Sequence, residues 1–461
     1  MRSYDVTFWS VRPGKAKTKR SYEVRWRVGG VQQSRSVGTR AQAENFLSEL
    51  RQAARAGEPF DTDTGLPASL VPAPAARSWL ALCLAYVDMK WPTAAPKTRD
   101  AMTDALAAIV PAVTTEHPPA PITTADLRAV LRHHLLAPPS RNRPRPPEVA
   151  AAIRWLEKHS LPVPEIAAPG LARKVLEAIS VRQDGRAAAL VTITRKRSVF
   201  ANVLRYAIEL DELASNPLDR LSWKPPKASE TVDRRVVANP RQARELLTAV
   251  TYVGQRGGGE RSRGPRLMAL YACMYFAALR PAEAVALRER NCSLPGSGWG
   301  RLTLETSRPE VNGRWTDNGA VHDERGLKHR PESESRSVPI PPELVAVLRC
   351  HIDRFGIAED GRVFASERGQ VIASTAISDV WAEARTLALT PDQVASPLAR
   401  RPYDLRHAGV SLWLNAGVAP TDVAARAGHS VQVLLRVYAK CLDDGEATAN
   451  RRIEAALDQR F

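Results

Sequence analysis

Apolar and polar residues alternate with a period of two in the first part of the chain, and this pattern predicts a small β-sheet. The predicted strands cover 6–8, 22–28 and 31–37. Gly29 and Gly30 separate the last two strands and supply the turn of a hairpin. From Thr39 onward the apolar residues recur at helical spacing, with Phe46 and Leu47 in the stripe. Residues 1–60 are therefore expected to form a module of one sheet and one helix.

A change of composition marks the start of a second region. Residues 61–75 are rich in Pro, Gly, Thr and Asp and are expected to be a linker. Residues 76–226 have apolar positions at helical spacing, interrupted by a proline-rich loop at 137–147. The predicted helices cover 78–90, 96–110, 124–136, 148–158, 171–179 and 187–210. This second region is expected to be a helical domain.

The C-terminal region mixes helical and strand patterns. A polar linker at 227–236 precedes it, and its apolar run at 267–279 is too short to cross a bilayer of about 30 Å, so we expect a buried helix there. The other predicted helices cover 240–253, 342–355, 374–388, 404–416, 420–427 and 431–440, with weak strands at 300–305 and 335–340. Residues 237–461 are expected to be a mixed α+β domain with one small sheet, so the whole chain is multidomain and mostly α.

Composition narrows the class of protein. The chain carries 66 Lys and Arg against 49 Asp and Glu, a formal net charge of +17. With 44% hydrophobic residues it can bury a core, so the basic excess indicates an anionic polymer such as nucleic acid as partner; a solvated basic surface is the alternative. The five cysteines are scattered without a CxxC pair, and the N-terminus lacks the apolar core of a signal peptide. We therefore expect a cytoplasmic protein without membrane contact.

Two basic segments are candidate DNA contacts. The candidates in the N-terminal sheet are Lys17, Lys19, Arg25, Trp26 and Arg27. A twisted sheet of this kind can lie in a DNA groove, and the alternative is a charge guard that protects an edge strand from aggregation. The candidates in the helix at 187–210 are Arg195, Lys196 and Arg197. They are expected to contact phosphates, and an ordinary solvated helix face is the alternative.

Four segments of the C-terminal region carry Arg, Lys, His and Tyr in an otherwise apolar setting. Their polar residues are Arg280, Lys328, Tyr403, Asp404, Arg406, His407, His429 and Tyr438. No single segment is specific, because Arg280 can pair with Glu283, His429 can cap a helix and Tyr438 can belong to the core. The order of these residues along the chain is more informative than any one of them.

In that order the residues resemble the tyrosine recombinase (phage integrase) family, whose pattern runs Arg, Lys on a β-hairpin, His-x-x-Arg, Gly-His and Tyr. The stretch 402–440 resembles the signature block of the family, and 278–288 resembles its first arginine block. The resemblance covers residues 237–450 and, more weakly, the helical middle. It implies a catalytic domain at 237–461, a core DNA-binding domain at 76–226, an arm-type DNA-binding module at 1–60, and a chain that closes on DNA as a C-shaped clamp.

The resemblance also implies a reaction. Tyr438 would attack a DNA phosphate to give a 3′-phosphotyrosyl link and a free 5′-hydroxyl, without ATP, metal or other cofactor. Arg280 and Arg406 would hold the non-bridging oxygens, because a guanidinium matches phosphate geometry. Lys328 would be the general acid for the leaving 5′-oxygen, and His429 would donate to a phosphate oxygen.

The family also implies partners. Strand exchange through a Holliday junction needs two duplexes cut in ordered pairs, so a homotetramer on double-stranded DNA attachment sites is expected, with an excisionase or a host DNA-bending protein as possible accessory factors. The residues after Tyr438 include Ile453, Leu457 and Phe461. This tail either packs on a neighbouring protomer or folds back on its own domain.

The sequence departs from the family pattern at Tyr403, which occupies the position where the family has His. A phenol can hydrogen-bond to phosphate, but it cannot serve as a neutral base near pH 7. Proton acceptance from Tyr438 would then pass to water or to another group, and Asp404 and His407 are the neighbours that would compensate.

A second departure is the long charged segment at 305–325, ahead of Lys328. Its length makes the lysine the least secure of the assigned roles. A metal site built from His322, Asp323 and His329 is a minor alternative, because no fourth ligand is evident. Three other functions also stay open: a Xer-like resolvase with the same chemistry, a catalytically inactive DNA-binding protein of the same fold, and a metal-dependent nuclease.

Overall fold

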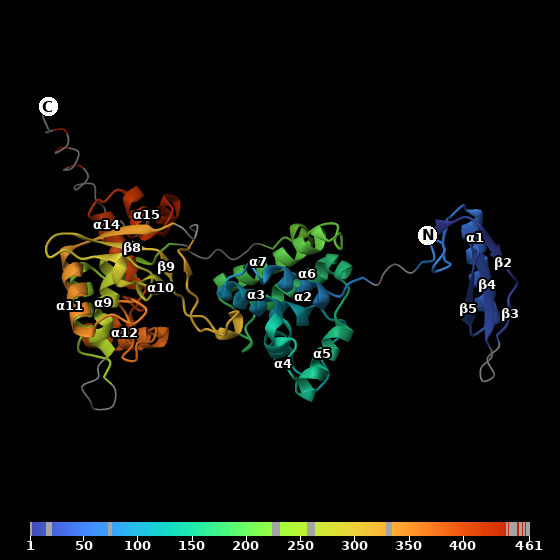
Figure 1. Cartoon of the computed structure of the whole chain (residues 1–461), viewed down its shortest axis with the longest axis horizontal. Helices are drawn as coiled ribbons and strands as arrows, with labels where there is room; N and C mark the ends of the chain where they lie inside the picture. The colour runs from blue at the N-terminus through green and yellow to red at the C-terminus, as the bar shows by residue number, and fades with distance from the viewer. Residues whose placement is uncertain are drawn as a thin grey trace.

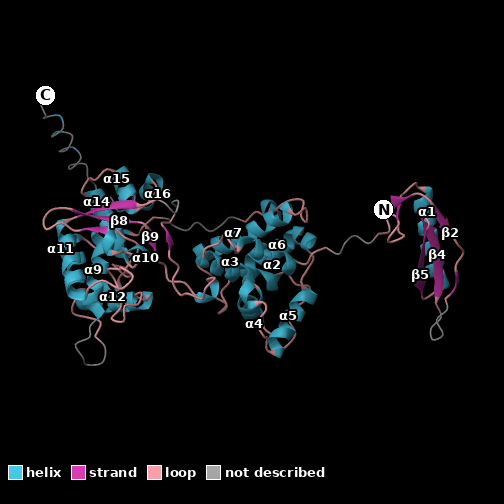
Figure 2. Ribbon diagram, viewed as in Figure 1, coloured by secondary structure: helices cyan, strands magenta, loops and turns pink. Residues whose placement is uncertain are grey.

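The structure is a computed structural model that describes residues 2–14, 21–71, 76–223, 231–255, 263–328 and 334–438, together with residues 441, 450, 454 and 457. Along the chain it shows a β-rich N-terminal module, a helical region, and a C-terminal region of helices around a small sheet (Figure 1). Figure 2 shows that helices dominate both larger regions. The predicted class, mostly α with small sheets, is confirmed. Over the described residues, none of the helices combines the length and apolar character that a membrane span requires.

The N-terminal module is a four-stranded antiparallel sheet covered by one helix. Its elements are β1 (Arg2–Ser3), β2 (Val6–Phe8), β3 (Arg12–Pro13), β4 (Tyr22–Val28), β5 (Val31–Val37), α1 (Arg40–Arg55) and β6 (Phe60–Asp61). Strand β4 pairs with β2, β3 and β5, while β1 pairs with β6. Thr39 and Gln42 form a capping box that begins α1. Alternate β4 residues Val24, Trp26 and Val28 face α1 and are buried.

The expected linker at 61–75 is structured over its first half. Phe60 and Asp61 pair with β1, and the backbone carbonyl of Gly65 accepts a hydrogen bond from Trp26 at 2.5 Å. Leu66 and Leu70 pack against the core of the module. The composition predicted a linker because Pro and Gly favour turns. Turns can, however, pack against a hydrophobic core as well as connect separate domains. The division of the chain into domains stays a prediction.

The helical region contains six α-helices: α2 (Trp79–Lys90), α3 (Pro96–Ile109), α4 (Thr124–Val130), α5 (Pro147–His159), α6 (Pro169–Ser180) and α7 (Leu190–Glu209). Trp79 and Phe200 meet edge to face at its centre, with ring centroids 5.8 Å apart. The helix predicted at 124–136 changes at Leu131 to a π-helical turn, Leu131–Leu135. The helix predicted at 187–210 begins at Leu190, because Ala187 forms a β-bridge with Val181.

The C-terminal region surrounds one buried helix. Its helices are α8 (Pro240–Val250), α9 (Arg263–Phe276), α10 (Pro281–Ala284), α11 (Pro342–Phe355), α12 (Ser374–Ala388), α13 (Pro391–Ala395), α14 (Asp404–Asn415), α15 (Pro420–Ala427) and α16 (Val431–Tyr438). The apolar run predicted to be a buried helix corresponds to α9, which contacts α8, α11, α12 and α14. Val232, in the expected linker at 227–236, is buried and donates its N–H to the carbonyl of Val437 at 2.8 Å.

The sheet of this region is small and antiparallel. Strands β7 (Cys292–Ser293), β8 (Gly300–Leu304) and β11 (Arg336–Ile340) form it in the order β11-β8-β7, and the two longer strands match those predicted. A separate ladder joins β9 (Thr306–Ser307) to β10 (Arg325–Gly326). Periodicity missed β9 and β10, because two-residue strands carry no pattern.

The segment between β9 and β10 reaches the helical region, and we call residues 308–324 the docking arm (Figure 1). Trp315 on the arm is 2% exposed and belongs to the hydrophobic core of the helical region. Its ring lies 6.3 Å from that of Trp91, and the Arg132 guanidinium lies over it. The segment that looked like a charged insertion in the sequence therefore carries a buried anchor.

Candidate active site

Five of the six residues predicted to be catalytic lie on the short elements that follow α9 and on α14 to α16. Arg280 precedes α10, Tyr403 and Arg406 lie at the start of α14, His429 follows α15, and Tyr438 ends α16. Helices α14, α15 and α16 contact one another, and α10 contacts α9. Residues far apart in the sequence are therefore brought together at one place in the fold.

Arg406 is the most deeply buried of these residues, with an exposed fraction of 0%. Its guanidinium donates to the carbonyls of Ala278 and Ala427, and Nη2 lies 2.9 Å from Nε2 of His429. Burial lowers the pKa of Arg406 from its ordinary value, and the neighbouring Arg280 adds to this effect. The three contacts join the chain before α10, the end of α15 and His429 around a single cation.

Glu283 organises two further arginines. Its carboxylate, 1% exposed, accepts from Arg280 at 2.7 Å and from Arg336 at 3.0 and 2.6 Å. Burial alone would raise the pKa of Glu283, but Arg336 and Arg280 outweigh burial and lower it to about 2. The structural partner expected for Arg280 is therefore present, and the other end of the Arg280 guanidinium donates to the Gly428 carbonyl at 2.9 Å.

Gly428 allows the arginines and His429 to come this close. It ends α15 with φ 65° and ψ 49°, a left-handed conformation that glycine adopts without strain. A Cβ atom at this position would overlap with Nη1 of Arg336. The His429 N–H bonds the Ala424 carbonyl at 2.9 Å, so His429 does extend a helix cap, while its ring points to Arg406. Burial and the adjacent cations, with Arg406 first, lower the pKa of His429 to about 3.

Tyr438 is buried, 1% exposed, and its hydroxyl lies 2.9 Å from Nδ1 of His407. Burial raises the pKa of Tyr438 well above its ordinary value, and Arg406 partly opposes that rise. The Tyr438 ring also lies 6.1 Å from the ring of His429. The hydroxyl is therefore neutral and hydrogen-bonded, and it lies among the same side chains that surround Arg406.

The remaining two predicted catalytic residues have different surroundings. Tyr403 is half-buried at the N-cap of α14, and its ring meets that of His407 edge to face at 5.1 Å. Lys328 is exposed on the turn that follows β10, and it is outside the hydrogen-bonded cluster described above. Because β9 contacts α10, which begins beside Arg280, the turn belongs to the same side of the region.

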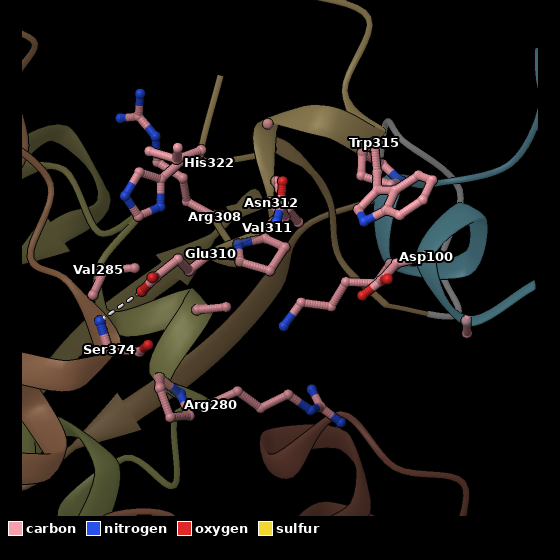
Figure 3. A pocket seen from close by; sticks show the side chains of 18 of the residues that line it. Asp100, Arg280, Val285, Arg308, Glu310, Val311, Asn312, Trp315, His322 and Ser374 are labelled. Carbon is pink, nitrogen blue, oxygen red and sulfur yellow. Dashed lines mark hydrogen bonds between the residues drawn. The ribbon is translucent and has the colours of Figure 1, made fainter. Parts of the chain in front are cut away.

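A cleft of about 1150 Å³ opens beside Arg280 (Figure 3). It is lined by residues of both the helical region and the C-terminal region. The charged residues of its lining are Lys97, Asp100, Asp104, Arg132, Arg195, Arg280, Arg308 and Glu310. Asp100 and Asp104 are both paired with Arg132, and Glu310 accepts from the Ser374 N–H at 2.6 Å. Since cations outnumber anions in the lining, the cleft suits an anionic ligand.

The predicted DNA contacts of the N-terminal sheet differ from one another in the structure. Trp26 was expected in a DNA groove, but it is 2% exposed, because the alternation of β4 turns it towards Phe46 of α1. That prediction is wrong for Trp26. Arg25 and Arg27 face the other side of the sheet, where Arg27 is exposed and Arg25 lies over the Trp9 ring. Lys17 and Lys19 lie outside the described residues.

The predicted contacts of α7 also separate. Lys196 was expected to contact phosphate, but its side chain is 8% exposed and its ammonium lies 3.2 Å from Asp104, so it belongs to the packed side of the helix. Arg195 is half-exposed and lines the cleft. Arg197 stacks on the Trp223 ring at 5.1 Å. Three consecutive residues of a helix point about 100° apart, which places them in three environments.

A metal site was the minor alternative. In the part of the chain that the structure describes, no three His, Cys, Asp or Glu side chains form a group that could hold a metal ion. His322 forms a β-bridge with Glu310 in the docking arm, and His329 lies outside the described residues. Sequence reasoning missed Arg336 as a member of the site. Its position on a predicted strand carried no signal, because only the fold brings that strand to Glu283.

No protein-family model and no curated protein matches this sequence. Among solved structures, the chain is similar to the Tn1549 transposon integrase in complex with transposon right end DNA, with 15% identity, coverage of 68% of this chain and 95% of that chain, and a TM-score of 0.47. It is similar to the XerH site-specific recombinase bound to difH substrate, with 12% identity, 78% and 95% coverage, and a TM-score of 0.42. It is also similar to the lambda integrase bound to DNA, with 13% identity, 58% and 78% coverage, and a TM-score of 0.37.

Identities and TM-scores this low carry no argument about this chain, so its activity is inferred from its own side chains. The solved chains to which this chain is similar are described as a transposon integrase, a site-specific recombinase and the lambda integrase, and the resemblance predicted from the signature residues stays a prediction for this chain.

Proposed function

We propose that this protein is a site-specific tyrosine recombinase of the integrase type, which cuts and rejoins DNA through a 3′-phosphotyrosyl intermediate. The observation that carries the proposal is the cluster around the Tyr438 hydroxyl. A nucleophile, a histidine that contacts it at 2.9 Å, and a guanidinium that contacts a second histidine at 2.9 Å come from helices α14 and α16 and from the loop after α15. A purely structural tyrosine does not require this set.

The proposed chemistry is a transesterification. The Tyr438 oxygen forms a bond to phosphorus, the bond from phosphorus to the 5′-oxygen breaks, and the leaving oxygen takes a proton from Lys328. Arg280 and Arg406 stabilise the charge on the non-bridging oxygens, which is where most of the rate enhancement is expected to arise. His429 is neutral in this structure. It donates a hydrogen bond to the phosphate either from the ring N–H that it already holds or after it gains a proton.

The electrostatic field of the site supports binding of one phosphate. Three guanidinium groups, those of Arg280, Arg336 and Arg406, lie near the Glu283 carboxylate, which is ion-paired with Arg280 and Arg336. The excess positive charge lies where little water competes with a ligand for the guanidinium groups. A phosphate dianion or diester therefore gains more binding free energy there than at the protein surface. In this structure Tyr438 and Arg406 are almost fully buried. Attack therefore requires a shift of α16 that exposes the hydroxyl.

The finer assignment to an integrase depends on the N-terminal module. Its sheet presents Arg27 on the face opposite α1, where an arm-type DNA site would bind. The working form proposed is a homotetramer on double-stranded attachment sites, through a Holliday junction, with an excisionase or a host DNA-bending protein as accessory factor. Of the tail residues, Leu457 is 78% exposed, whereas Ile453 and Phe461 lie outside the described residues. Packing of the tail on a neighbouring protomer stays a prediction.

Covalent capture on DNA tests the proposal. A nicked suicide duplex carrying the attachment site loses the short strand after cleavage, so a protein–DNA adduct accumulates. Wild-type protein is expected to form the adduct and Tyr438→Phe is not, while the control Tyr252→Phe, at a tyrosine that is 69% exposed, behaves as wild type. No adduct with wild-type protein on any attachment site would leave the inactive DNA-binding protein as the better interpretation.

Two further measurements separate the other candidates. A metal-dependent nuclease loses activity in EDTA, whereas a tyrosine recombinase keeps it, and only the latter leaves the protein attached to a 3′ end. A Xer-like resolvase would not need the N-terminal sheet. Equal recombination by wild type and by a double variant Arg25→Ala, Arg27→Ala would favour the resolvase.

A further inference from the structure

The position that the family pattern assigns to histidine holds Tyr403, so the group that takes the proton of the nucleophile is an open question for this chain. In the structure, His407 and not Tyr403 contacts the Tyr438 hydroxyl, with 2.9 Å between Nδ1 and the oxygen. In the tautomer whose hydrogen is on Nε2, Nδ1 accepts this hydrogen bond from the hydroxyl. The distance is within the range expected of a general base and its proton.

We propose that His407 is the general base that accepts the Tyr438 proton in the cleavage step and returns it on religation. The inference rests on the proposed function. In cleavage, the hydroxyl proton moves to Nδ1 of His407, the phenolic oxygen bonds to phosphorus, and the 5′-oxygen leaves with a proton from Lys328. In religation the 5′-hydroxyl gives its proton back to Lys328, and the departing Tyr438 oxygen takes the proton held by His407.

The geometry of α14 explains why this residue can take the role. Arg406 and His407 are consecutive, so their side chains point about 100° apart. The first is directed to the Ala278 and Ala427 carbonyls, and the second is directed to α16. Tyr403 is four residues before His407 and lies on the same face, where its ring supports the imidazole at 5.1 Å. Tyr403 is thus a positioning residue.

The charge state of His407 is suited to proton acceptance. Burial, with Arg406 and Arg401 adding to it, lowers the pKa of His407 to about 4, so the ring is neutral at pH 7. The groups that face it are Tyr403, Arg401 and Arg406 from α14 and the residues before it, Tyr438 from α16, and His429. A phosphate in the site brings negative charge, which favours the imidazolium that forms when the proton moves.

Three variants separate proton transfer from hydrogen bonding and packing. His407→Asn keeps an acceptor oxygen near the place of Nδ1 but cannot hold a proton at neutral pH. His407→Ala opens a space that added imidazole can enter. Tyr403→Phe keeps the supporting ring. The rate of adduct formation is measured in single turnover on the nicked suicide duplex, with DNA affinity and thermal unfolding recorded for each variant.

The expected result is a loss of roughly 10²- to 10⁴-fold in adduct formation for His407→Asn, with DNA affinity unchanged. Imidazole is expected to restore part of the His407→Ala rate, and Tyr403→Phe is expected to lose less than about threefold. For wild type the rate of adduct formation rises with pH through the pKa of His407, because only the neutral ring accepts a proton. The pH profile of His407→Asn is expected to lack this rise.

A duplex with sulfur in place of the bridging 5′-oxygen gives an independent comparison, because a thiolate leaves without a general acid. It is expected to rescue Lys328→Ala and to leave His407→Asn slow. A wild-type rate in His407→Asn, or equal rescue of both variants by sulfur, would overturn the inference and leave the proposed function intact. An adduct absent from wild type, or retained in Tyr438→Phe, would overturn the proposed function and with it this inference.

Discussion

Arg99 and Asp317 are 218 residues apart and form a two-point ion pair, with 2.7 Å from Nη1 to Oδ1 and 3.1 Å from Nη2 to Oδ2. Arg99 is 3% exposed on α3 and also donates to the carbonyls of Trp91 and Trp315 at 3.0 Å. Nη1 and Nη2 therefore hold the docking arm, while Nε holds the end of α2. Because the arm lies between β9 and β10, the contact ties the helical region to the turn that carries Lys328.

Trp315→Ala is expected to release the docking arm. Removing a tryptophan from a core costs roughly 3–5 kcal/mol, and Arg132 would also lose the ring beneath it. Faster proteolysis within residues 308–324 and a lower Tm would be the readouts. Trp299, which is 63% exposed, provides the control variant Trp299→Ala, expected to change stability by less than about 0.5 kcal/mol. An arm that resists protease equally in both variants would contradict the docking contact.

Glu283→Gln is expected to destabilise the site and to remove part of the acid sensitivity of the protein. The pKa of Glu283 is lowered from 4.5 to about 2, so its carboxylate stabilises the fold above pH 4.5 and this contribution is lost as pH falls from 4.5 towards 2. The difference corresponds to about 3 kcal/mol. Urea unfolding from pH 7 to pH 3 measures it.

In the Glu283→Gln variant the loss of stability on acidification should be smaller than in wild type over that range. The exposed Glu367 offers the control Glu367→Gln, which should follow the wild-type curve. Parallel pH curves for wild type and Glu283→Gln would show that the carboxylate is not ion-paired as described.

Gly428→Ala is expected to impair catalysis more than stability alone explains. Alanine at φ 65° costs roughly 1–2 kcal/mol, and its Cβ would also displace Arg336 from Glu283. Gly361 has φ 83° and open space around it, so Gly361→Ala carries the backbone strain without the overlap. Adduct formation and Tm are compared for the two variants. Similar loss of adduct formation at equal Tm would argue against a role for the Arg336 contact.

Arg195 and Lys196 are adjacent, and substitution of each is expected to have a different effect. Arg195→Ala removes an exposed cation of the cleft, so the slope of log affinity for DNA against log salt should fall by about one while Tm is unchanged. Lys196→Ala removes a buried partner of Asp104 and should cost about 1–3 kcal/mol of stability without changing that slope. The reverse pattern would restore the sequence-based assignment of Lys196 to DNA.

Local features of the fold followed from the sequence because they depend on neighbours in the chain. The helix starts near Thr39 and Pro240 and the apolar run that forms α9 depend on residues within one or two turns of each other. Trp26 shows the limit of this reasoning. Alternation correctly placed it on a strand, but the choice of face was set by α1, which packs against that strand from further along the chain.

By itself the sequence determined the order along the chain of the candidate reactive groups Arg280, Arg406, His429 and Tyr438, and their catalytic roles stay predictions. The tertiary structure decided which groups touch. His407 meets Tyr438 across 31 residues, Glu283 meets Arg336 across 53, and Arg99 meets the docking arm across 218. The periodicity of apolar residues indicates on which face of a helix or strand a side chain lies. Which other element packs against that face depends on how whole helices and strands pack together, and no local sequence pattern encodes this.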